Sequence, residues 1–395
     1  MSKPLKSFIT RPTAALATAV TLALTACGGG GSAGGGSGTL AMSLTDAPAC
    51  GYSNVFVTIT KLSVNQSSSA SVTDAGWVDI PVTAQRVDLV SLQNGVLAQL
   101  GQTPLPEGKY TQMRLLLADN ASASAGQPIP NSVIPTGGSE SALTTPSAQQ
   151  TGLKLNVDID VAADKLADFV IDFNVCKSIV AAGASGKYLL KPVLAVTPHY
   201  VSGVKGSVDA SIAGAANATV LLEQGGKVVK ATAPDSTGSF LLEPVAPGTY
   251  DLVVTSSGHV TSVVTDVVVT TDTLTTVGTP IKSPASILAD GTLSGTVTPV
   301  DAMLSVTQKV GSGVTSRTIE VTGGPANATT GAYAYVVPVG AVSVAPYATG
   351  TLTFGSDVAN AGQYNVSATS GTVTKSSALL TVAAGATVAT NFMFP

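Results

Sequence analysis

Short stretches in which apolar and polar residues alternate recur along most of the chain, and residues that favour turns separate them. Leu40, Met42 and Leu44 alternate in this way, as do residues 55–59 and 154–161. A period of two places successive side chains on opposite faces of a strand, so one face of each strand can enter a core. With 41 glycines and 22 prolines for turns, the pattern predicts a mainly β protein of two or three tandem antiparallel β-sandwich domains. At most one or two short helices are expected, in the first domain.

The charge composition excludes several classes of protein. Only 11% of the residues are charged and the formal net charge is −4, so we expect no basic surface for a phosphate backbone and no nucleic-acid partner. The two histidines, His199 and His259, fall in different predicted domains, and no His-Glu-x-x-His helix or Gly-x-Ser-x-Gly elbow between a strand and a helix is evident. We therefore predict that the protein is not an enzyme and has no cofactor and no metal centre.

The amino terminus has the layout of an export signal. Three basic residues precede an uncharged stretch, residues 13–26, which is too short to span a bilayer comfortably. The stretch ends in Leu24-Thr25-Ala26-Cys27, which resembles a bacterial lipobox. That resemblance implies a lipoprotein signal peptide over residues 1–26 and a diacylglycerol group on the thiol of Cys27. The alternative is a buried apolar helix with an incidental cysteine, but the glycines that follow would leave such a helix nothing to pack against.

The residues after Cys27 indicate how the folded part is attached. Residues 27–38 form a Gly/Ser linker, whose composition is typical of a flexible spacer. The membrane is thus a predicted partner, reached through the N-terminal acyl chains. In lipoproteins an aspartate directly after the acylated cysteine implies retention in the inner membrane, whereas this chain has Gly28. We therefore expect a cell-envelope protein that is anchored in the outer membrane.

The two other cysteines fit an exported protein. If Cys27 is acylated, Cys50 and Cys176 remain, and an even number of thiols in an oxidising compartment favours a disulfide. We predict the pair Cys50–Cys176. The alternative is two buried free thiols.

The strand pattern divides the chain after the linker into three units. The first covers residues 39–200; within it, the spacing of apolar residues over 88–100 predicts one short helix, and the polar run at 119–151 predicts a mobile loop. The second unit covers 203–282. The third covers 286–395 and repeats the order of strands and turns of the second, with an insertion near 339–361.

Motifs of the first unit resemble a known family. Residues 43–48, Ser-Leu-Thr-Asp-Ala-Pro, are followed by Val-Phe-Val-Thr-Ile-Thr-Lys-Leu at 55–62 and Pro-Glu-Gly-Lys-Tyr at 106–110. Together with Asp172-Phe173 and Lys191-Pro192-Val193, this set is similar to a family of domains of unknown function common in prokaryotic envelope lipoproteins. The resemblance implies a location and a β-rich fold, but no catalytic residues.

The second unit resembles a different family. Its opening, Val204-Lys205-Gly206-Ser207-Val208, and its turns at 235–240 and 247–250 are similar to the carboxypeptidase regulatory-like domain. That family has a transthyretin-type sandwich, grouped with carbohydrate-binding-like folds. The resemblance implies the fold, and it implies sugar binding only by analogy.

Few residues qualify as site candidates. Trp77 is a candidate ligand contact, although burial is the favoured interpretation for an aromatic residue in an alternating strand. Carboxylates are calcium ligands, but acidic residues also commonly occupy the solvated face of a strand. We favour the solvated face for the four aspartates that could serve as cation ligands: Asp46, Asp158, Asp160 and Asp172. The tyrosines of three Gly-x-Tyr sequences, Tyr110, Tyr250 and Tyr364, are expected to be structural.

These features lead to a functional prediction. A low charge, an anchored linker and tandem sandwiches are typical of a lipid-anchored cell-envelope protein with a non-catalytic binding, adhesion or scaffolding role, whose partner would be an envelope glycan or a protein. The alternative is a carbohydrate-binding surface lipoprotein, which the resemblance of the second unit suggests.

Overall fold

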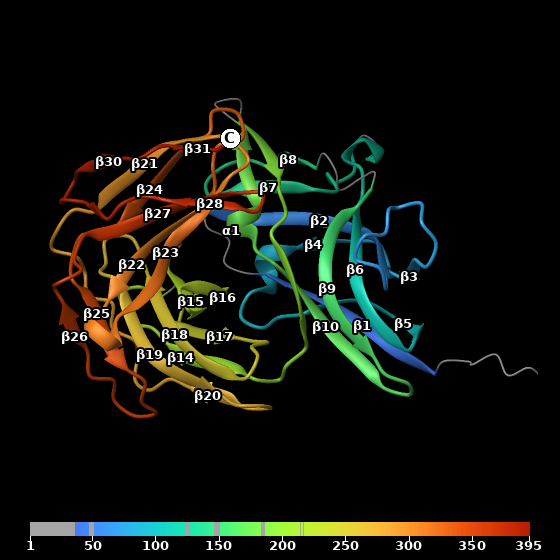
Figure 1. Cartoon of the computed structure of the whole chain (residues 1–395), viewed down its shortest axis with the longest axis horizontal. Helices are drawn as coiled ribbons and strands as arrows, with labels where there is room; N and C mark the ends of the chain where they lie inside the picture. The colour runs from blue at the N-terminus through green and yellow to red at the C-terminus, as the bar shows by residue number, and fades with distance from the viewer. Residues whose placement is uncertain are drawn as a thin grey trace, which may run out of the picture. The chain divides into compact units, whose positions relative to one another are not determined.

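The computed structural model (Figure 1) describes residues 36–46, 51–123, 126–145, 151–182, 186–213, 215 and 217–395. Residues 36–395 form one compact unit. The described chain is mainly β, which confirms the predicted fold class, and it contains one short α-helix, α1 (Val175–Ser178). Within the described ranges, no helix has the length and apolarity needed to cross a membrane. The predicted signal peptide, residues 1–26, and Cys27 lie outside the described residues.

Two sheets enclose the core of the first domain, which comprises β1 to β13. The smaller sheet has the strand order β13-β10-β1-β5, and the larger has the order β11-β12-β8-β7-β2-β6-β9, with β3 and β4 paired to β2. The strands are β1 (Ser37–Asp46), β2 (Tyr52–Asn65), β3 (Val78–Ile80), β4 (Gln85–Asp88), β5 (Ala98–Pro106), β6 (Gly108–Leu117), β7 (Ser132–Pro135), β8 (Ser141–Thr144), β9 (Leu153–Val161), β10 (Leu166–Phe173), β11 (Ile179–Ala182), β12 (Lys187–Leu190) and β13 (Leu194–Pro198).

Alternation places the expected apolar faces in this core. In β9 the side chains of Leu155, Val157, Ile159 and Val161 are buried, whereas the residues between them are exposed. The same core holds buried side chains of β1 and β2, from the two different sheets. Each strand therefore contributes one apolar face to the core, and the packing of these faces holds the two sheets together.

The segment expected to be helical is mostly extended. Only a 3₁₀ turn, η1 (Leu89–Leu92), follows β4, and β5 already begins at Ala98. Between them Asn94 and Gly95 have positive φ angles of 56° and 76°. These two residues reverse the chain and end the helical turn, so the spacing of apolar residues over 88–100 does not continue as a helix.

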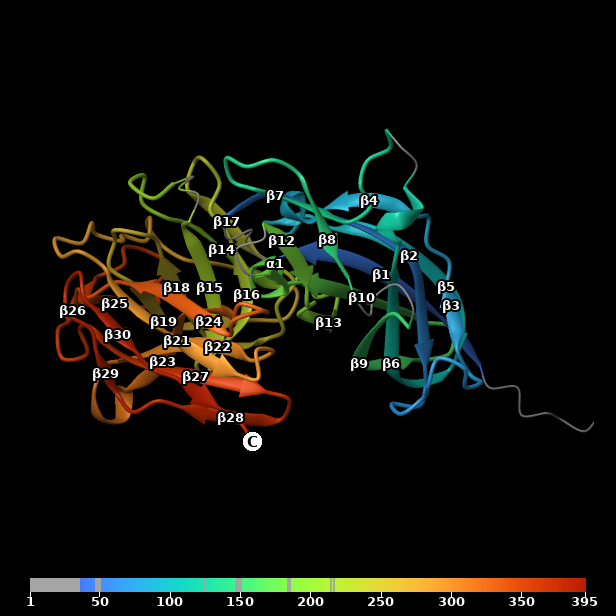
Figure 2. The same ribbon diagram turned by 90° about the horizontal axis from the view of Figure 1, so that it is seen from above.

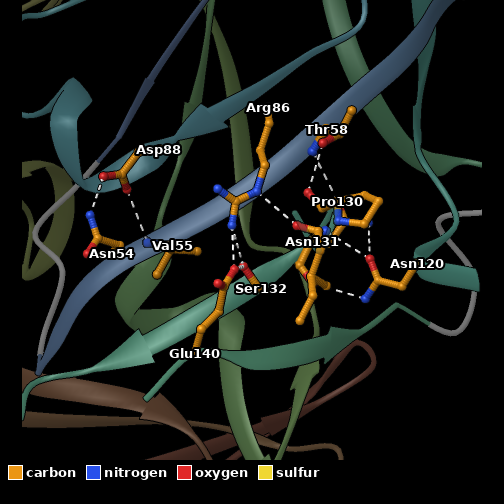
Figure 3. A network of polar contacts seen from close by, with 11 residues as sticks. Asn54, Val55, Thr58, Arg86, Asp88, Asn120, Pro130, Asn131, Ser132 and Glu140 are labelled. Atoms are coloured by element: carbon orange, nitrogen blue, oxygen red, sulfur yellow. Dashed lines mark hydrogen bonds and ion pairs between the residues drawn. The ribbon is translucent and has the colours of Figure 1, made fainter. Parts of the chain in front are cut away.

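The prediction of a mobile loop over residues 119–151 is wrong for its described residues. They contain β7 and β8, which pair with β2 and β12 of the large sheet. Asn131 is fully buried; its side chain accepts a hydrogen bond from the amide of Thr58 (3.1 Å) and donates one to the carbonyl of Ala118 (2.7 Å). Figure 3 shows how Asn120 faces Asn131 in this network. Polar side chains thus satisfy the backbone of this segment, while Val133 and Leu143 bury its apolar face in the core of the first domain.

An arginine joins β4 to the same segment. Arg86 donates to the hydroxyl of Ser132 (2.9 Å) and to a carboxylate oxygen of Glu140 (2.5 Å). Its guanidinium lies 3.4 Å from the centre of the Phe56 ring. These contacts, drawn in part in Figure 3, are structural, since they tie β7 and β8 to the sheet.

The second sandwich comprises β14 to β20, and the third comprises β21 to β31 without β25 and β26. The second has the strands β14 (Gly203–Ser207), β15 (Thr219–Gln224), β16 (Lys227–Thr232), β17 (Ser239–Leu242), β18 (Gly248–Thr255), β19 (Ser262–Val269) and β20 (Leu274–Thr276). The third has the strands β21 (Gly291–Thr298), β22 (Met303–Val310), β23 (Arg317–Pro325), β24 (Ala332–Val337), β27 (Gln363–Ser370), β28 (Val373–Ser376), β29 (Leu380–Thr381), β30 (Thr387–Ala389) and β31 (Phe392–Met393).

The two sandwiches have the same strand order. The second consists of the sheets β17-β14-β20 and β16-β15-β18-β19, and the third of β24-β21-β30 and β23-β22-β27-β28. In both, the first strand pairs in parallel with a late strand, β14 with β20 and β21 with β30. These parallel pairs differ from the purely antiparallel expectation. A parallel pair needs a long connection between its two strands. Here the strands of the opposite sheet lie between the two partners along the chain and provide that connection.

Strands from the predicted insertion at 339–361 join the second sandwich. β25 (Val342–Pro346) pairs in parallel with β19, and β26 (Gly355–Asp357) pairs with β25. The outward face of this sheet is buried as well, because Leu221, Val253 and Val263 belong to the core cluster of the third sandwich. The sheet is therefore covered on both faces, by the core of the second sandwich on one side and by the core of the third on the other.

The tyrosines of the Gly-x-Tyr sequences are structural, as predicted. Tyr110 and Tyr250 bury their rings, and their hydroxyl groups donate to the carbonyl of the residue four positions earlier, at 3.1 and 2.8 Å. Tyr364 is fully buried, and its hydroxyl donates to the carbonyl of Pro338. These hydrogen bonds hold the start of each strand against the segment whose carbonyl accepts the bond.

Candidate functional site

A cleft of about 710 Å³ lies where the first domain meets both sandwiches. Its walls come from residues 51–53 and α1 of the first domain, from β15, β16 and residues 255–257 of the second sandwich, and from β23 of the third. Figure 1 shows α1 between the first domain and the strands of the third sandwich, and Figure 2 shows it beside β16. The volume is within the range of ligand sites in proteins, so this cleft is the candidate functional site.

Most of the polar groups in the cleft are uncharged. Hydroxyl and amide side chains line it from all three domains, next to aliphatic surface from Leu221, Val228 and Val336. Among the described residues that line it, the charged side chains are Lys177, Glu320 and Asp290. A surface of this kind can bind a polar ligand without a strong electrostatic field.

An ion pair at the cleft connects the first domain to the third sandwich. The ammonium group of Lys177, in α1, lies 2.6 Å from Oε1 of Glu320, in β23. The side chain of Glu320 is 9% exposed, and its Oε2 accepts a hydrogen bond from the hydroxyl of Ser305 (2.9 Å). With both oxygens bonded, the pair is a fixed part of the wall.

A second carboxyl group lies behind this pair. Glu223, at the end of β15, is 1% exposed, and its Oε2 accepts the backbone amide of Glu320 at 2.8 Å. Its Oε1 has no hydrogen-bond partner among the described residues. Burial raises the pKa of Glu223 from 4.5 to about 8, and the nearby carboxylates of Glu320 and Asp251 act in the same direction. Glu223 is therefore protonated at neutral pH.

Two further acidic residues at this interface, Asp251 and Asp266, contact Arg317. Burial raises the pKa of Asp251, although the guanidinium of Arg317 lies 3.3 Å away and opposes the shift. Arg317 also donates to both carboxylate oxygens of Asp266, at 2.8 and 2.7 Å. Arg317 of the third sandwich thus pairs with two carboxylates of the second, the largely buried Asp251 and the exposed Asp266, at the edge of the interface.

The first domain is tied to the second sandwich by Asn94. Its side chain accepts hydrogen bonds from the hydroxyl of Thr232 (2.9 Å) and the amide of Leu241 (3.2 Å), and donates one to the carbonyl of Ala233 (3.2 Å). The positive φ of Asn94 directs the turn toward β16. The segment predicted as a helix is therefore an interdomain contact.

Asp172, a predicted cation candidate, belongs to the same interface. Its carboxylate pairs with the ammonium group of Lys230 in β16, and the side chains are 19% and 5% exposed. A buried ammonium needs a counter-charge, so this carboxylate already has a structural role.

The other candidate aspartates do not form one group: Asp158 and Asp160 share the exposed face of β9 beside Lys109, whereas Asp46 ends β1. Asp158 pairs with Lys109 across β6 and β9 (2.7 Å), and Asp160 is exposed on the same strand. Asp46 is buried, and its Oδ1 accepts the amide of Val175 (3.2 Å). In the part of the chain that the structure describes, no three acidic, histidine or cysteine residues form a group that could hold a metal ion.

Trp77 is half-buried and lies outside the cleft. Its indole nitrogen donates to the carbonyl of Ser71 (2.8 Å), and the guanidinium of Arg114 lies 5.3 Å from its ring. Both contacts are internal, so the structure assigns no ligand to this ring.

The aromatic residue in the cleft is Tyr52. Its ring meets that of Tyr188 edge-on at 6.2 Å, and burial raises its pKa to about 12, with a smaller contribution from Tyr188. Its hydroxyl is therefore neutral at physiological pH and acts as a hydrogen-bonding group only.

The cysteines are placed only in part. Cys176 is in α1 and lines the cleft. Cys50 and Cys27 lie outside the described residues, so acylation of Cys27 and the Cys50–Cys176 disulfide stay predictions.

The histidines contact neither a serine hydroxyl nor a thiol among the described residues. Nδ1 of His199 lies 2.8 Å from a carboxylate oxygen of Asp168, and Nδ1 of His259 lies 3.1 Å from the carbonyl of Ser257. That the protein is not an enzyme stays a prediction as well.

Sequence reasoning missed the residues that build the cleft. Lys177 and Glu320, which line the cleft, and Glu223, which lies behind them, come from three domains. Only Glu223 carried a signal, because it follows Leu221 on one face of its strand, whereas Glu320 shares its strand face with Thr318 and Thr322.

Comparison with solved structures shows only weak similarity. A cohesin–X-dockerin complex from Acetivibrio cellulolyticus contains a chain that is 28% identical over 21% of this chain, with a TM-score of 0.18, and the match spans 58% of that chain. The pilus adhesin SpaC from Lactobacillus rhamnosus GG is 10% identical over 91% of this chain and 44% of its own, with a TM-score of 0.15. A leucine-rich repeat protein from Bacteroides thetaiotaomicron is 12% identical over 63% of this chain and 27% of its own, with a TM-score of 0.14.

No curated protein matches the chain. A family model does match part of it, over most of the range in which the sequence motifs predict a domain of unknown function. The chain therefore carries, over residues 37–192, a region that matches the family described as domain of unknown function DUF4382.

Proposed function

We propose that this protein is a lipid-anchored cell-envelope protein with a non-catalytic binding and scaffolding role, and that the cleft between its three domains is the binding site. The observation that carries the proposal is the cleft itself. It has the volume of a ligand site, it is lined from three domains, and two of its charged side chains, Glu320 and Lys177, neutralise each other. A catalytic pair would instead need an activated nucleophile or a group aimed at a substrate.

The interfaces support a scaffolding role. Asn94 and Lys230 join the first domain to the second sandwich, while β25 and β26 join the third sandwich to the second. Contacts of this kind hold the three domains as one body, so a bound partner would be presented in a fixed orientation.

The proposed anchor is the acylated thiol of Cys27. Its sequence context, Leu24-Thr25-Ala26-Cys27, resembles a lipobox, and Gly28 favours the outer membrane. The assignment of residues 203–282 to the carboxypeptidase regulatory-like family is part of the same proposal. It is supported by two sheets with the order β17-β14-β20 and β16-β15-β18-β19.

The anchor is tested by labelling the producing cells with an alkyne analogue of palmitate. We expect the wild-type protein to take up the label and to fractionate with the outer membrane, and Cys27→Ser to do neither. An unlabelled wild-type protein, or a Cys27→Ser variant with unchanged fractionation, would show that the protein is not a lipoprotein.

Two further measurements test the compartment and the absence of catalysis. Reduction of the intact protein should raise its mass by two hydrogen atoms if Cys50 and Cys176 form a disulfide; an unchanged mass would contradict the pairing. A screen against ester, peptide and glycoside substrates should show no turnover that depends on the cleft.

A narrower candidate is a carbohydrate-binding surface lipoprotein. The uncharged hydroxyl and amide groups of the cleft favour it, because such groups exchange hydrogen bonds readily with a hydroxylated ligand.

A further inference from the structure

Several polar side chains of the cleft make no hydrogen bond to the part of the chain that the structure describes. Among the described residues this holds for Ser53, Gln93, Thr136, Thr219, Thr255 and Thr322, each of which lines the cleft. They come from all three domains: the first contributes three, the second two and the third one. Each group can donate as well as accept, so together they suit a ligand that also carries both functions on many atoms.

The charges of the cleft argue against an anionic ligand. The ammonium of Lys177 already faces the carboxylate of Glu320 at 2.6 Å. The carboxylate of Asp290 accepts the amide of Gly258 at 3.1 Å and adds a negative charge to the lining. An anion would thus find no unpaired cation among the described residues of the cleft, and would face one further negative charge.

The strand edges of the cleft argue against a peptide that adds a strand. Such a peptide bonds to successive backbone groups along an open edge. In β23 the amide of Glu320 already donates to Glu223, and just after β16 the carbonyl of Ala233 accepts from Asn94. Because these backbone groups are already bonded, a ligand in the cleft would form its hydrogen bonds with side chains rather than with the backbone.

The apolar part of the lining fits a sugar, the ligand class that the two preceding arguments leave. Leu221, Val228 and Val336 and the half-buried Tyr52 give the cleft flat aliphatic and aromatic surface beside its hydroxyl groups. A sugar ring presents the same combination, with C–H groups on its faces and hydroxyl groups around its edge.

We infer that the cleft binds a neutral oligosaccharide, recognised by the hydroxyl and amide side chains that three domains contribute. This inference rests on the proposed function, since it names the ligand class of the same site. The bound sugar replaces the water on these side chains, while the Lys177–Glu320 pair keeps the wall in place.

The test uses the detergent-solubilised full-length protein and isothermal titration calorimetry. The neutral probes are maltotriose, cellotriose and the trimer of N-acetylglucosamine, the anionic probe is the trimer of galacturonic acid, and a library of extended peptides covers the other ligand class. We expect saturable binding of at least one neutral trimer, and weaker or no binding of the anionic trimer and the peptides.

The variants remove hydroxyl groups without changing side-chain shape. Thr219→Val, Thr255→Val and Thr322→Val place a β-branched residue in the same strands, so the fold should persist. Combined, they should weaken neutral-sugar binding about tenfold or more, given the usual net contribution of a hydrogen bond. The matched control is Thr249→Val, an exposed position of β18 outside the cleft, which should bind like the wild type. Circular dichroism and thermal unfolding verify that the single variants, the triple variant and the control all fold.

The outcomes separate the two proposals. Binding of none of the neutral trimers, preference for the anionic trimer or a peptide, or an unchanged affinity of the folded triple variant would each overturn the inference. Acylation of Cys27 and fractionation are measured independently, so the ligand class can fail while the lipid anchor stands.

Discussion

The buried carboxyl of Glu223 makes the stability of this protein depend on pH. Its pKa is 4.5 in an exposed chain and about 8 in the folded protein, chiefly because of burial. Between about pH 4.5 and pH 8, the folded protein therefore keeps a proton on this carboxyl group that the unfolded chain has released. At pH 7, which lies about 2.5 pH units above the unfolded pKa, each unit corresponds to about 1.4 kcal/mol, so the retained proton disfavours folding by about 3 kcal/mol.

Replacing Glu223 by glutamine should remove this cost. The amide is isosteric with the protonated carboxyl and can still accept the amide of Glu320, but it does not ionise. Below pH 4.5 both proteins are neutral at this position and should be equally stable. As pH rises toward 8, the wild type should lose stability relative to Glu223→Gln, up to a plateau above the folded pKa.

The assay is urea unfolding at a series of pH values, followed by far-ultraviolet circular dichroism. The single tryptophan, Trp77, lies in the first domain, so its fluorescence alone would not report on the sandwiches. Glu107→Gln, at an exposed position, is the control for loss of one negative charge and should follow the wild type. A Glu223→Gln variant with the same pH profile as the wild type would refute the argument, because Glu223 would then be ionised in the fold.

Three further predictions concern the interfaces. Asn94→Ala removes three side-chain hydrogen bonds to the second sandwich and should lower the free energy of unfolding by about 2 to 3 kcal/mol in urea titrations; an unchanged midpoint would contradict this role. Lys230→Met leaves Asp172 without its counter-charge and should cost about 3 kcal/mol, most of which a second substitution, Asp172→Leu, should restore in a double-mutant cycle. A chain that lacks residues 286–395 loses β25 and β26 and exposes the outer face of the β15–β19 sheet. It should aggregate in size-exclusion chromatography, whereas a monodisperse fragment would show that the second sandwich folds alone.

Local patterns predicted much of the fold. The alternation in segments such as 154–161 determined which faces of the strands are buried, and the Gly-x-Tyr sequences predicted the buried tyrosines with their backbone hydrogen bonds. Both signals lie within a few residues of the chain, and the physical cause, burial of one strand face or closure of one turn, is equally local.

The cleft could not be predicted in the same way. Lys177, Glu223 and Glu320 are far apart in the sequence, and each is an ordinary polar residue within its own segment. Their contacts depend on how the sheets pack, which the amino-acid pattern of a single strand does not specify.

What the sequence determined by itself is therefore the β class, the buried faces and the presence of a region that matches the DUF4382 family, since each depends on periodicity or motif within a segment. Only the tertiary structure decided that β25 and β26 complete the second sandwich, that Asn94 joins two domains, and that Glu223 is buried beside Glu320. These features arise from pairing and side-chain complementarity between distant segments, where the free energy of the interface rather than local preference selects the arrangement.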